Sequence, residues 1–497
     1  MQPVLKRLAK MVAGYGMVQW AGPFLSLIFT PIITRILNPD DYGVADYVIT
    51  ISSAVGVVSL LALPQALTAH FNDRQDVEWQ RRVTGSALAL VVIIGIVIGA
   101  GLIICAPTLA QSAPVTRGYA YLFEWMGMTA VMGLAAAVLA TAAQAALRVR
   151  WGMALSITAI LGTVLGNVLF IVVLRLGVTG MVLTPILTGM AICMVALILT
   201  RRMIGKPSIR IAGLLLQTGV WLLPAALAGW ALQVADRFFL AQYVSAQELG
   251  YYAIANRIAT LLYVAIGPLF AAYTPLVLSI QHDPDARQRY ATLARYLVAI
   301  VLVAGLALGL FATEMLIVLT RTAYLPAAVY VGFLTYVHTF GAINMILYTG
   351  GLASKQFKGI AWTVLAGATV NLALNFLLIP PYGVWGATAA TFIGYAVPPV
   401  LLYLWLQPRY PVPYPVARIV AAVAMQLGLM VVGLYVPPLA FPVRIGIKLL
   451  TFSLLPLSFV AIGMVTRREL RQAFALARNQ WTSQRTRLFP PKRSGAK

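Results

Sequence analysis

Long apolar stretches recur along the whole chain, and they constrain its fold more than any other feature of the sequence. A helix needs about 20 largely apolar residues to span the hydrocarbon core of a bilayer. On that rule we predict membrane helices at 11–33, 44–70, 84–105, 119–147, 153–174, 179–200, 212–241, 250–280, 292–319, 325–352, 359–379, 384–406, 415–436 and 444–466. The sequence therefore predicts an all-α integral membrane protein with about fourteen transmembrane helices.

The composition excludes a soluble protein. Of the 497 residues, 61% are hydrophobic and only 10% are charged, whereas soluble domains carry about 25% charged residues. The two cysteines, Cys105 and Cys193, fall in apolar stretches and make neither a disulfide framework nor a metal site. The sequence has no phosphate-binding Gly-x-x-x-x-Gly-Lys motif and no His-Glu-x-x-His motif. We therefore expect no cofactor and no metal, with proton or sodium coupling left open.

The positive charge is distributed in a way that argues against nucleic-acid binding. The net charge is +23, but the cations lie in short clusters between the apolar stretches. These clusters are Lys6/Arg7/Lys10, Arg81/Arg82, Arg148/Arg150, Arg201/Arg202/Lys206/Arg210, Arg287/Arg289, Lys355/Lys358 and the tail after 466. Such a bias marks the cytoplasmic loops of membrane proteins. With an even number of helices, both termini are predicted to be cytoplasmic. The N-terminal apolar run is interpreted as a retained helix, not as a cleaved signal peptide.

The chain also repeats itself at a spacing of 206 to 210 residues. Asp41-Tyr42-Gly43 returns as Glu248-Leu249-Gly250, and Gly95-x-x-x-Gly99 returns as Gly305-x-x-x-Gly309. A spacing of six helices preserves orientation, so the halves are predicted to be parallel repeats, which in transporters hold the substrate between them. We predict an N-terminal lobe at 1–205, a C-terminal lobe at 206–408, two extra helices at 409–466 and a basic cytoplasmic tail at 467–497.

Two segments resemble a known family. Residues 34–43, Thr-Arg-Ile-Leu-Asn-Pro-Asp-Asp-Tyr-Gly, resemble the loop after the first helix of polysaccharide-type flippases, with Asn38 where that family more often has glycine. Residues 236–240 and 248–252 are similar to the seventh-helix pattern of the same proteins. They belong to the multidrug/oligosaccharidyl-lipid/polysaccharide exporter superfamily, which includes the Wzx-like O-antigen flippases. The motif positions are Arg35, Asp41, Gly43, Glu248 and Gly250.

The resemblance implies a specific activity. It implies a carrier in the bacterial inner membrane that moves undecaprenyl-pyrophosphate-linked oligosaccharide from the cytoplasmic to the outer leaflet by alternating access, without a chemical step. The product would serve O-antigen, capsule or exopolysaccharide synthesis, and a polysaccharide polymerase or another assembly protein is a candidate partner.

Candidate substrate-binding residues cluster on the predicted seventh and eighth helices. Ionisable residues inside membrane helices are costly and are functional candidates. Trp230, Gln233 and Arg237 share one helical face, and the Arg237 guanidinium suits phosphate oxygens. Asp236 points about 100° away and is interpreted as pairing with a neighbouring helix. On the eighth helix the candidates are Tyr252, Asn256, Thr260 and Tyr263, with Arg257 as a second cavity cation.

The first two helices offer matching positions in the other lobe. These are Tyr15, Gln19, Ser26 and Thr30 on the first helix and Asp46, Thr50 and Ser53 on the second. Asp46 is a candidate for ion coupling, but an ion pair with Arg237 or Arg257 is favoured. Arg35 is expected to order its loop, and His338 is interpreted as a hydrogen-bonded structural residue.

Two alternatives remain open. A cation-coupled multidrug exporter of the same superfamily would favour intramembrane carboxylates over arginines. A membrane polymerase or ligase would need a large extracytoplasmic loop, and the loops here are short. The segment from Leu470 to Trp481 in the tail is amphipathic and is expected to bind the anionic membrane surface.

Overall fold

A computed structural model describes residues 29–466, apart from residues 75, 147, 282, 355 and 435–439, together with residue 469. Within that part the chain is helical and has no strand, which confirms the predicted all-α class. Twelve of its helical segments are long and apolar enough to cross a membrane. Gln19, most of the predicted first helix and nearly all of the basic tail lie outside the described residues, so the count of fourteen stays a prediction.

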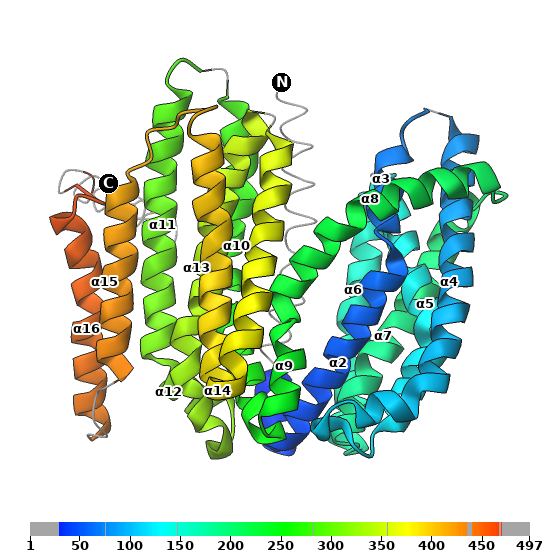
Figure 1. Ribbon diagram of the computed structural model, residues 1–497, viewed down its shortest axis with the longest axis horizontal. Helices are drawn as coiled ribbons and strands as arrows, with labels where there is room; N and C mark the ends of the chain where they lie inside the picture. The colour runs from blue at the N-terminus through cyan, green and yellow to red at the C-terminus, as the bar shows by residue number, and fades with distance from the viewer. Residues whose placement is uncertain are drawn as a thin grey trace, which may run out of the picture.

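The described helices form two bundles that meet at one end and diverge at the other (Figure 1). Lobe 1 contains α2 (Pro39–Leu60), α3 (Leu63–His70), α4 (Val77–Gln111), α5 (Ala120–Ala145), α6 (Val149–Gly166), the π-helical η2 (Asn167–Val173) and α7 (Val178–Thr200). Lobe 2 contains α9 (Asp236–Tyr243), α10 (Ala246–Ser279), α11 (Ala286–Leu310), α12 (Ala312–Leu319), α13 (Ala328–Ala353) and α14 (Phe357–Leu406).

Helix α8 (Ile209–Val234) crosses from one lobe to the other (Figure 1). In its first half, Ile211 and Leu215 share a buried cluster with Leu63 and Leu67 of α3. In its second half, Ala228 and Leu232 pack on Ala368 of α14. The first helix of the predicted C-terminal lobe is therefore shared between the two bundles.

Several predicted helices are interrupted, and local backbone chemistry accounts for the breaks. The stretch predicted at 44–70 breaks where Leu61 and Ala62 adopt left-handed backbone angles, φ 46° and 51°, directly before the first turn of α3 that holds Pro64. The stretch at 359–406 is continuous except at Gly383, whose φ of 53° and ψ of −127° are not helical. A helix of 50 residues would be about 75 Å long at 1.5 Å per residue. Because that exceeds the bilayer, α14 corresponds to two spanning helices joined at Gly383, as predicted from the sequence.

The lobes meet where the repeated motifs come together. A Cβ atom on Gly43 would lie 2.1 Å from the carbonyl oxygen of Ala246, and one on Gly250 would lie 2.0 Å from that of Pro39. The starts of α2 and α10 therefore touch through backbone atoms, which only glycine permits at this separation. The largest buried cluster surrounds this contact and includes residues of both lobes, among them Tyr42, Tyr252 and Tyr324. This is the closed end of the molecule.

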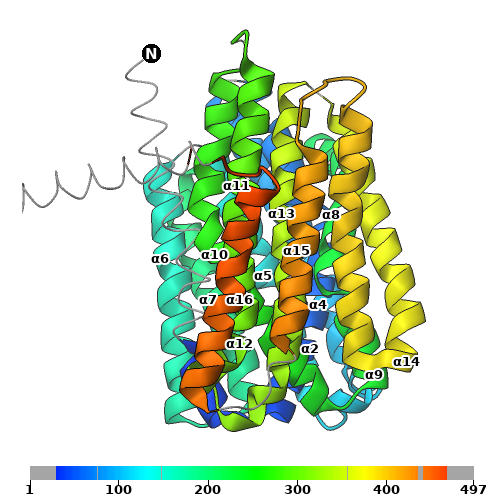
Figure 2. The same ribbon diagram turned by 90° about the vertical axis from the view of Figure 1, so that its left-hand side faces the viewer.

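The extra helices α15 (Val416–Leu434) and α16 (Phe441–Ala461) lie against lobe 2 on the side away from lobe 1 (Figures 1 and 2). Met430 of α15 fills the space that Gly309 and Gly332 leave on α11 and α13. Lys448 of α16 is buried and bonds to Glu314 of α12 at 2.7 Å. A cation inside the membrane needs such a partner, so this pair fixes α16 to lobe 2.

Candidate functional site

Arg237 sits at the junction of the two lobes, just after the chain bends between α8 and α9. The residue is buried, with 7% of its surface exposed. Nε donates to Oδ2 of Asp46 on α2 at 2.7 Å, and Nη1 lies 3.2 Å from Oδ1 of Asp236. Nη1 also lies 3.3 Å from the carbonyl oxygen of Gln233. A buried charge is tolerated only when it is paired and hydrogen-bonded, and Arg237 meets that condition with an acid from each lobe.

Asp236 was predicted to diverge from Arg237 along the helix and to pair with a neighbouring helix, and it makes both that pairing and an additional contact with Arg237. Both residues lie in the first turn of α9, where adjacent side chains diverge by about 100°, but the Arg237 side chain is long enough for Nη1 to reach Oδ1 of Asp236. The Asp236 carboxylate also accepts a short hydrogen bond from the Tyr252 hydroxyl and one of 3.4 Å from Thr391 of α14. It therefore ties α9, α10 and α14 together around the arginine, as well as pairing with neighbouring helices as expected.

A second arginine makes a similar contact one helical turn away. Arg257 of α10 donates from Nη1 to the Tyr42 hydroxyl at 2.5 Å, and its guanidinium carbon lies 6.0 Å from the centre of that ring. Tyr42 and Asp46 are four residues apart on α2 and so share one face. Two arginines of lobe 2 thus contact one stripe of lobe 1 close to the closed end.

Two cavities adjoin these arginines. One, of about 380 Å³, is lined by Thr30, Tyr42, Asp46, Arg237 and Arg257 among others. The second, of about 690 Å³, belongs to lobe 2 and is lined by Gln233, Asp236, Arg237, Asn256, Thr260, Tyr263, Phe270, His338, Thr391 and Tyr395 among others. Arg237, Asn256 and Thr260 line both. Of the predicted candidates on α8, α9 and α10, all but Trp230 and Tyr252 therefore line these cavities, although their roles in binding stay predictions.

Several other candidates hold the structure instead of facing these cavities. Tyr252 is fully buried, and its hydroxyl donates a hydrogen bond to Asp236. Trp230 donates from its indole to the Ser53 hydroxyl across the lobe interface at 3.0 Å. Glu248 forms a capping box with Ser245 at the start of α10. Among the motif-loop residues, Arg35 is exposed and Asp41 is partly exposed.

Sequence reasoning missed three residues of the larger cavity: His338, Thr391 and Tyr395. His338 was interpreted as a hydrogen-bonded residue, but its buried Nε2 atom has no hydrogen-bond partner among the described residues. Its ring centre lies 6.0 Å from that of Tyr263. Because α13 and α14 carry no arginine or acid at these positions, only their packing against α10 reveals that they line the cavity.

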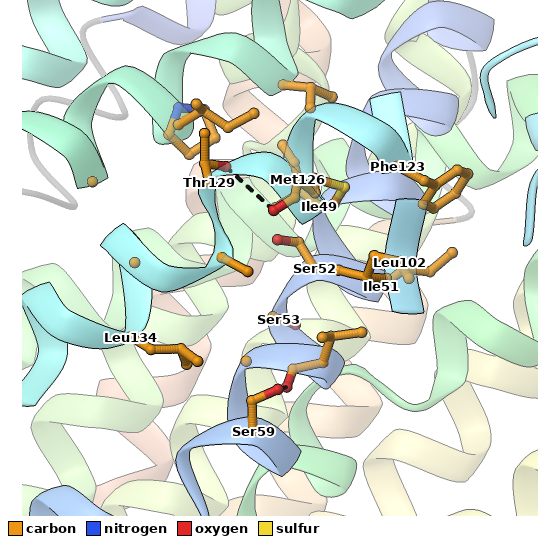
Figure 3. A pocket seen from close by; sticks show the side chains of 18 of the residues that line it. Ile49, Ile51, Ser52, Ser53, Ser59, Leu102, Phe123, Met126, Thr129 and Leu134 are labelled. Carbon is orange, nitrogen blue, oxygen red and sulfur yellow. Dashed lines mark hydrogen bonds between the residues drawn. The ribbon is translucent and has the colours of Figure 1, made fainter. Parts of the chain in front are cut away.

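Lobe 1 contains a cavity of opposite character, of about 330 Å³, between α2, α4, α5 and α7. Its described lining consists of aliphatic, aromatic, methionine and small residues with a few hydroxyls (Figure 3). The Ser59 and Thr129 hydroxyls donate to carbonyl oxygens of their own helices. Gly56, Gly133 and Gly189 face open space here. The described walls thus offer an apolar surface without the charged and amide groups that line the larger cavity of lobe 2.

Solved structures share this two-lobed helical fold. The lipid II flippase MurJ in an inward closed conformation aligns with a TM-score of 0.66 at 14% identity, over 90% of this chain and 99% of that chain. The inward-facing conformation of a multidrug resistance MATE family transporter of the MOP superfamily aligns with a TM-score of 0.65 at 16% identity, over 78% of this chain and 94% of that chain. The outward-facing conformation of a MATE family transporter aligns with a TM-score of 0.53 at 16% identity, over 81% of this chain and 96% of that chain. At these identities the likeness shows the fold alone.

The family is shown by the sequence itself. A family model described as polysaccharide biosynthesis protein matches residues 32–329, more than half of the chain. The chain belongs to this family of polysaccharide biosynthesis proteins, and it is a multi-pass membrane protein with the MOP-superfamily fold. The polysaccharide family expected from the two sequence motifs is confirmed, and the fold agrees with that of solved MOP-superfamily proteins. A search of curated proteins finds no match.

Proposed function

We propose that this chain is a flippase that moves undecaprenyl-pyrophosphate-linked oligosaccharide from the cytoplasmic to the outer leaflet of the bacterial inner membrane. The observation that carries the proposal is the pair of arginines, Arg237 and Arg257, beside polar cavities at the lobe interface. Guanidinium groups bind phosphate oxygens through parallel hydrogen bonds. Family membership and the fold shared with a lipid II flippase support it.

The orientation follows from the predicted topology. The closed end carries the loops with few cations, which are predicted to be extracytoplasmic. The separated end carries the basic clusters, so the cavities would be reached from the cytoplasm in this conformation. The better alignment with inward than with outward conformations supports this orientation. Alternating access would then separate the lobes at the closed end.

The bonds at the site suggest how the substrate would promote that step. Opening the closed end must break Arg237–Asp46 and Arg257–Tyr42, and each would leave a polar group without a partner. A pyrophosphate bound to both arginines would replace the carboxylate and the phenol, so the loaded carrier would open at lower cost than the empty one. Asp46, once released, would need a proton or a sodium ion in the arginine's place. We propose that this exchange supplies the coupling, without a chemical step on the substrate.

The polar residues of lobe 2 suit the glycan. Gln233, Asn256, Thr260 and Tyr263 present amide, hydroxyl and aromatic groups to the larger cavity, and sugars are recognised by such groups. We expect delivery of the product to a polysaccharide polymerase or another assembly protein for O-antigen, capsule or exopolysaccharide synthesis.

A multidrug exporter is the second candidate, because the MATE fold aligns nearly as well. The carboxylate of Asp236 lines the larger cavity and the lobe 1 cavity is apolar, both of which suit an organic cation. The close pairing of Asp236 with Arg237 opposes it, since the acid is already neutralised. A polymerase or ligase activity is disfavoured by the short loops between the described helices.

The test is flipping of a labelled undecaprenyl-pyrophosphate oligosaccharide in proteoliposomes. We compare the wild type with Arg237→Ala and Arg257→Ala, and use Arg35→Ala as the matched control because Arg35 is exposed and lines neither cavity. Flipping that is lost in the first two variants and kept in the control supports both the function and the site. Flipping kept in all three would retain the function and refute the site. No flipping by the wild type, together with export of an organic cation, would establish the exporter instead.

A further inference from the structure

Lobe 1 has a second pocket, which is lined by polar and charged residues as well as apolar ones. It has a volume of about 490 Å³ and lies at the separated end of the molecule. It lies where the ends of α3, α4, α5, α6 and α7 converge, far along the helices from the arginines of the lobe interface. Its described lining residues are Phe71, Asn72, Val77, Gln80, Arg81, Ala145, Ala146, Arg148, Trp151, Leu199, Arg202 and Met203. Three arginines therefore share one pocket: Arg81 near the start of α4, Arg148 at the N-cap of α6 and Arg202 just after α7.

These three arginines have no acidic partner among the described residues. None of Arg81, Arg148 and Arg202 is in an ion pair of the described part of the chain, and no carboxylate lines the pocket there. The acids that follow α3 are used elsewhere: Asp73 bonds to His70 and Glu78 to Arg82, and the Asp76 side chain caps α4. Like charges gathered without a counter-charge repel one another, and an anion relieves that repulsion.

Two of the arginines are held in place by the fold. Arg81 donates from Nε to the carbonyl oxygen of Arg202 at 2.7 Å, and the Arg148 guanidinium lies 4.3 Å from the centre of the Trp151 ring. The Arg81 hydrogen bond is made by Nε and not by the terminal nitrogens of the guanidinium. Arginine held in this way loses little freedom when it binds a planar or tetrahedral oxyanion.

The pocket also adjoins the connection from lobe 1 to α8, residues 204–208. Gly205 donates its amide to the carbonyl oxygen of Arg81 at 2.9 Å. A Cβ atom on Gly85 would lie 2.0 Å from the carbonyl oxygen of Gly205. The amide of Ser208 donates to the Ser86 hydroxyl at 2.9 Å. An anion that joins Arg81, Arg148 and Arg202 would therefore hold the start of this connection against α4 and α6.

We propose that this pocket binds a phosphate-bearing group at the membrane surface, separately from the transported substrate. The bias of cytoplasmic loops toward cations explains how many arginines lie at this end of the lobe. It does not explain why three of them enter one cavity while their sequence neighbours Arg82, Arg150 and Arg201 do not line it. The phosphate can come from an anionic lipid headgroup or from a soluble phosphate compound, because both present the same oxygens to the guanidiniums.

The sequence itself provides a matched control. The test variant combines Arg81→Gln, Arg148→Gln and Arg202→Gln, and the control combines Arg82→Gln, Arg150→Gln and Arg201→Gln. Both variants remove three positive charges from the same three regions of the chain: the start of α4, the start of α6 and the segment after α7. Binding to the purified full chain in neutral detergent is measured by calorimetric titration with short-chain phosphatidylglycerol in one arm and inorganic pyrophosphate in the other.

We expect the pocket variant to weaken binding by roughly tenfold or more, which corresponds to the loss of one or more charge-assisted bonds, and the control variant by less than about twofold. Tighter binding of the lipid would assign the site to a headgroup, and tighter binding of pyrophosphate to a soluble phosphate. Equal weakening in the two variants, or no binding of either probe to the wild type, would overturn the proposal. If the triple variant does not fold, Arg148→Gln against Arg150→Gln makes the same comparison, since both side chains are exposed.

Discussion

At the scale of single residues, one arginine links the acids of both lobes. Arg237 bonds to Asp46 of lobe 1 and to Asp236 of lobe 2, so its charge is compensated in a place that excludes most water. Removing one member of a buried pair leaves the other uncompensated and costs more than the pair contributed. The same bonds would thus have to stabilise the closed end and give way during transport.

The first prediction concerns this pair. Asp46→Asn and Arg237→Gln should each lower the stability of the chain, by about 3–5 kcal/mol for a fully buried pair and less here because Asp46 is partly exposed. The double variant should lose less than the sum of the two, because the second change removes a charge that is already unpaired. Thermal unfolding in detergent measures all three, and simple additivity would contradict the pairing.

At the scale of helices, glycine decides which faces can touch. Gly127 of α5 approaches the carbonyl oxygen of Gly99 on α4, where an added Cβ would lie 2.6 Å away, whereas Gly133 on the same helix meets open space. Small residues let membrane helices approach closely. The two copies of the Gly-x-x-x-Gly motif contact different kinds of neighbour. The first copy, Gly95 and Gly99, packs against α5. The second copy, Gly305 and Gly309, leaves space for the α15 side chains Gln426 and Met430, and Gly309 also lies against Gly332 of α13.

This contrast on α5 gives the second prediction. Gly133→Ala should leave thermal stability unchanged or raise it slightly, since alanine is favoured over glycine in a helix by about 0.5–1 kcal/mol. Gly127→Ala should lower it, because the new methyl group meets backbone that cannot move alone. Melting curves of the two variants are compared directly, and equal melting temperatures would refute the α4–α5 contact.

A third prediction concerns the contact between the repeated motifs. Gly43→Ala should force the starts of α2 and α10 apart, because its Cβ would lie 2.1 Å from the carbonyl oxygen of Ala246. A cysteine replacing the buried Ala327 at this end, in a chain without its two native cysteines, should then react faster with a soluble thiol reagent. Gly101→Ala is the control, since Gly101 faces open space. An unchanged reaction rate would mean that the closed end does not depend on this contact.

At the scale of the whole molecule, the two lobes share a buried core at one end and separate at the other (Figure 1). Helix α8 contacts both lobes, and α15 and α16 extend lobe 2 alone. The lobe 1 cavity is lined by apolar residues with a few hydroxyls, whereas the lobe 2 cavity adds an arginine, a carboxylate and amide groups to a partly apolar lining. This asymmetry suits a substrate with an anionic, sugar-bearing head better than two equivalent half-sites would.

The fourth prediction follows from the proposed alternating access. Spin labels at Asn72 and Gln356 report on the separated end, and labels at Gln111 and Tyr243 report on the closed end. Lipid-linked oligosaccharide should shorten the first distance and lengthen the second, as measured by pulsed electron resonance in nanodiscs. A change of the same sign at both ends would contradict rocking of the lobes about the site.

Much of this protein could be predicted from its sequence, because a bilayer leaves a chain few choices. Apolar stretches of spanning length must become helices, since no water satisfies their backbone groups. The all-α class and the pairing of Asp46 with an arginine followed from residue type and spacing, whereas the family followed from the resemblance of two motifs. The interruption at Leu61 and Ala62 was not predicted, because neither residue type favours the left-handed backbone angles that both adopt.

What only the tertiary structure decided is which side chains share a space. His338 and Tyr395 lie about 80 and 140 residues from Asn256 in the sequence and line the same cavity. Arg81, Arg148 and Arg202 looked like separate topogenic clusters until the ends of five helices brought them into one pocket. Helical periodicity determines which residues of one helix share a face. It carries no information on which faces of different helices meet, because that is set by the packing of the whole bundle.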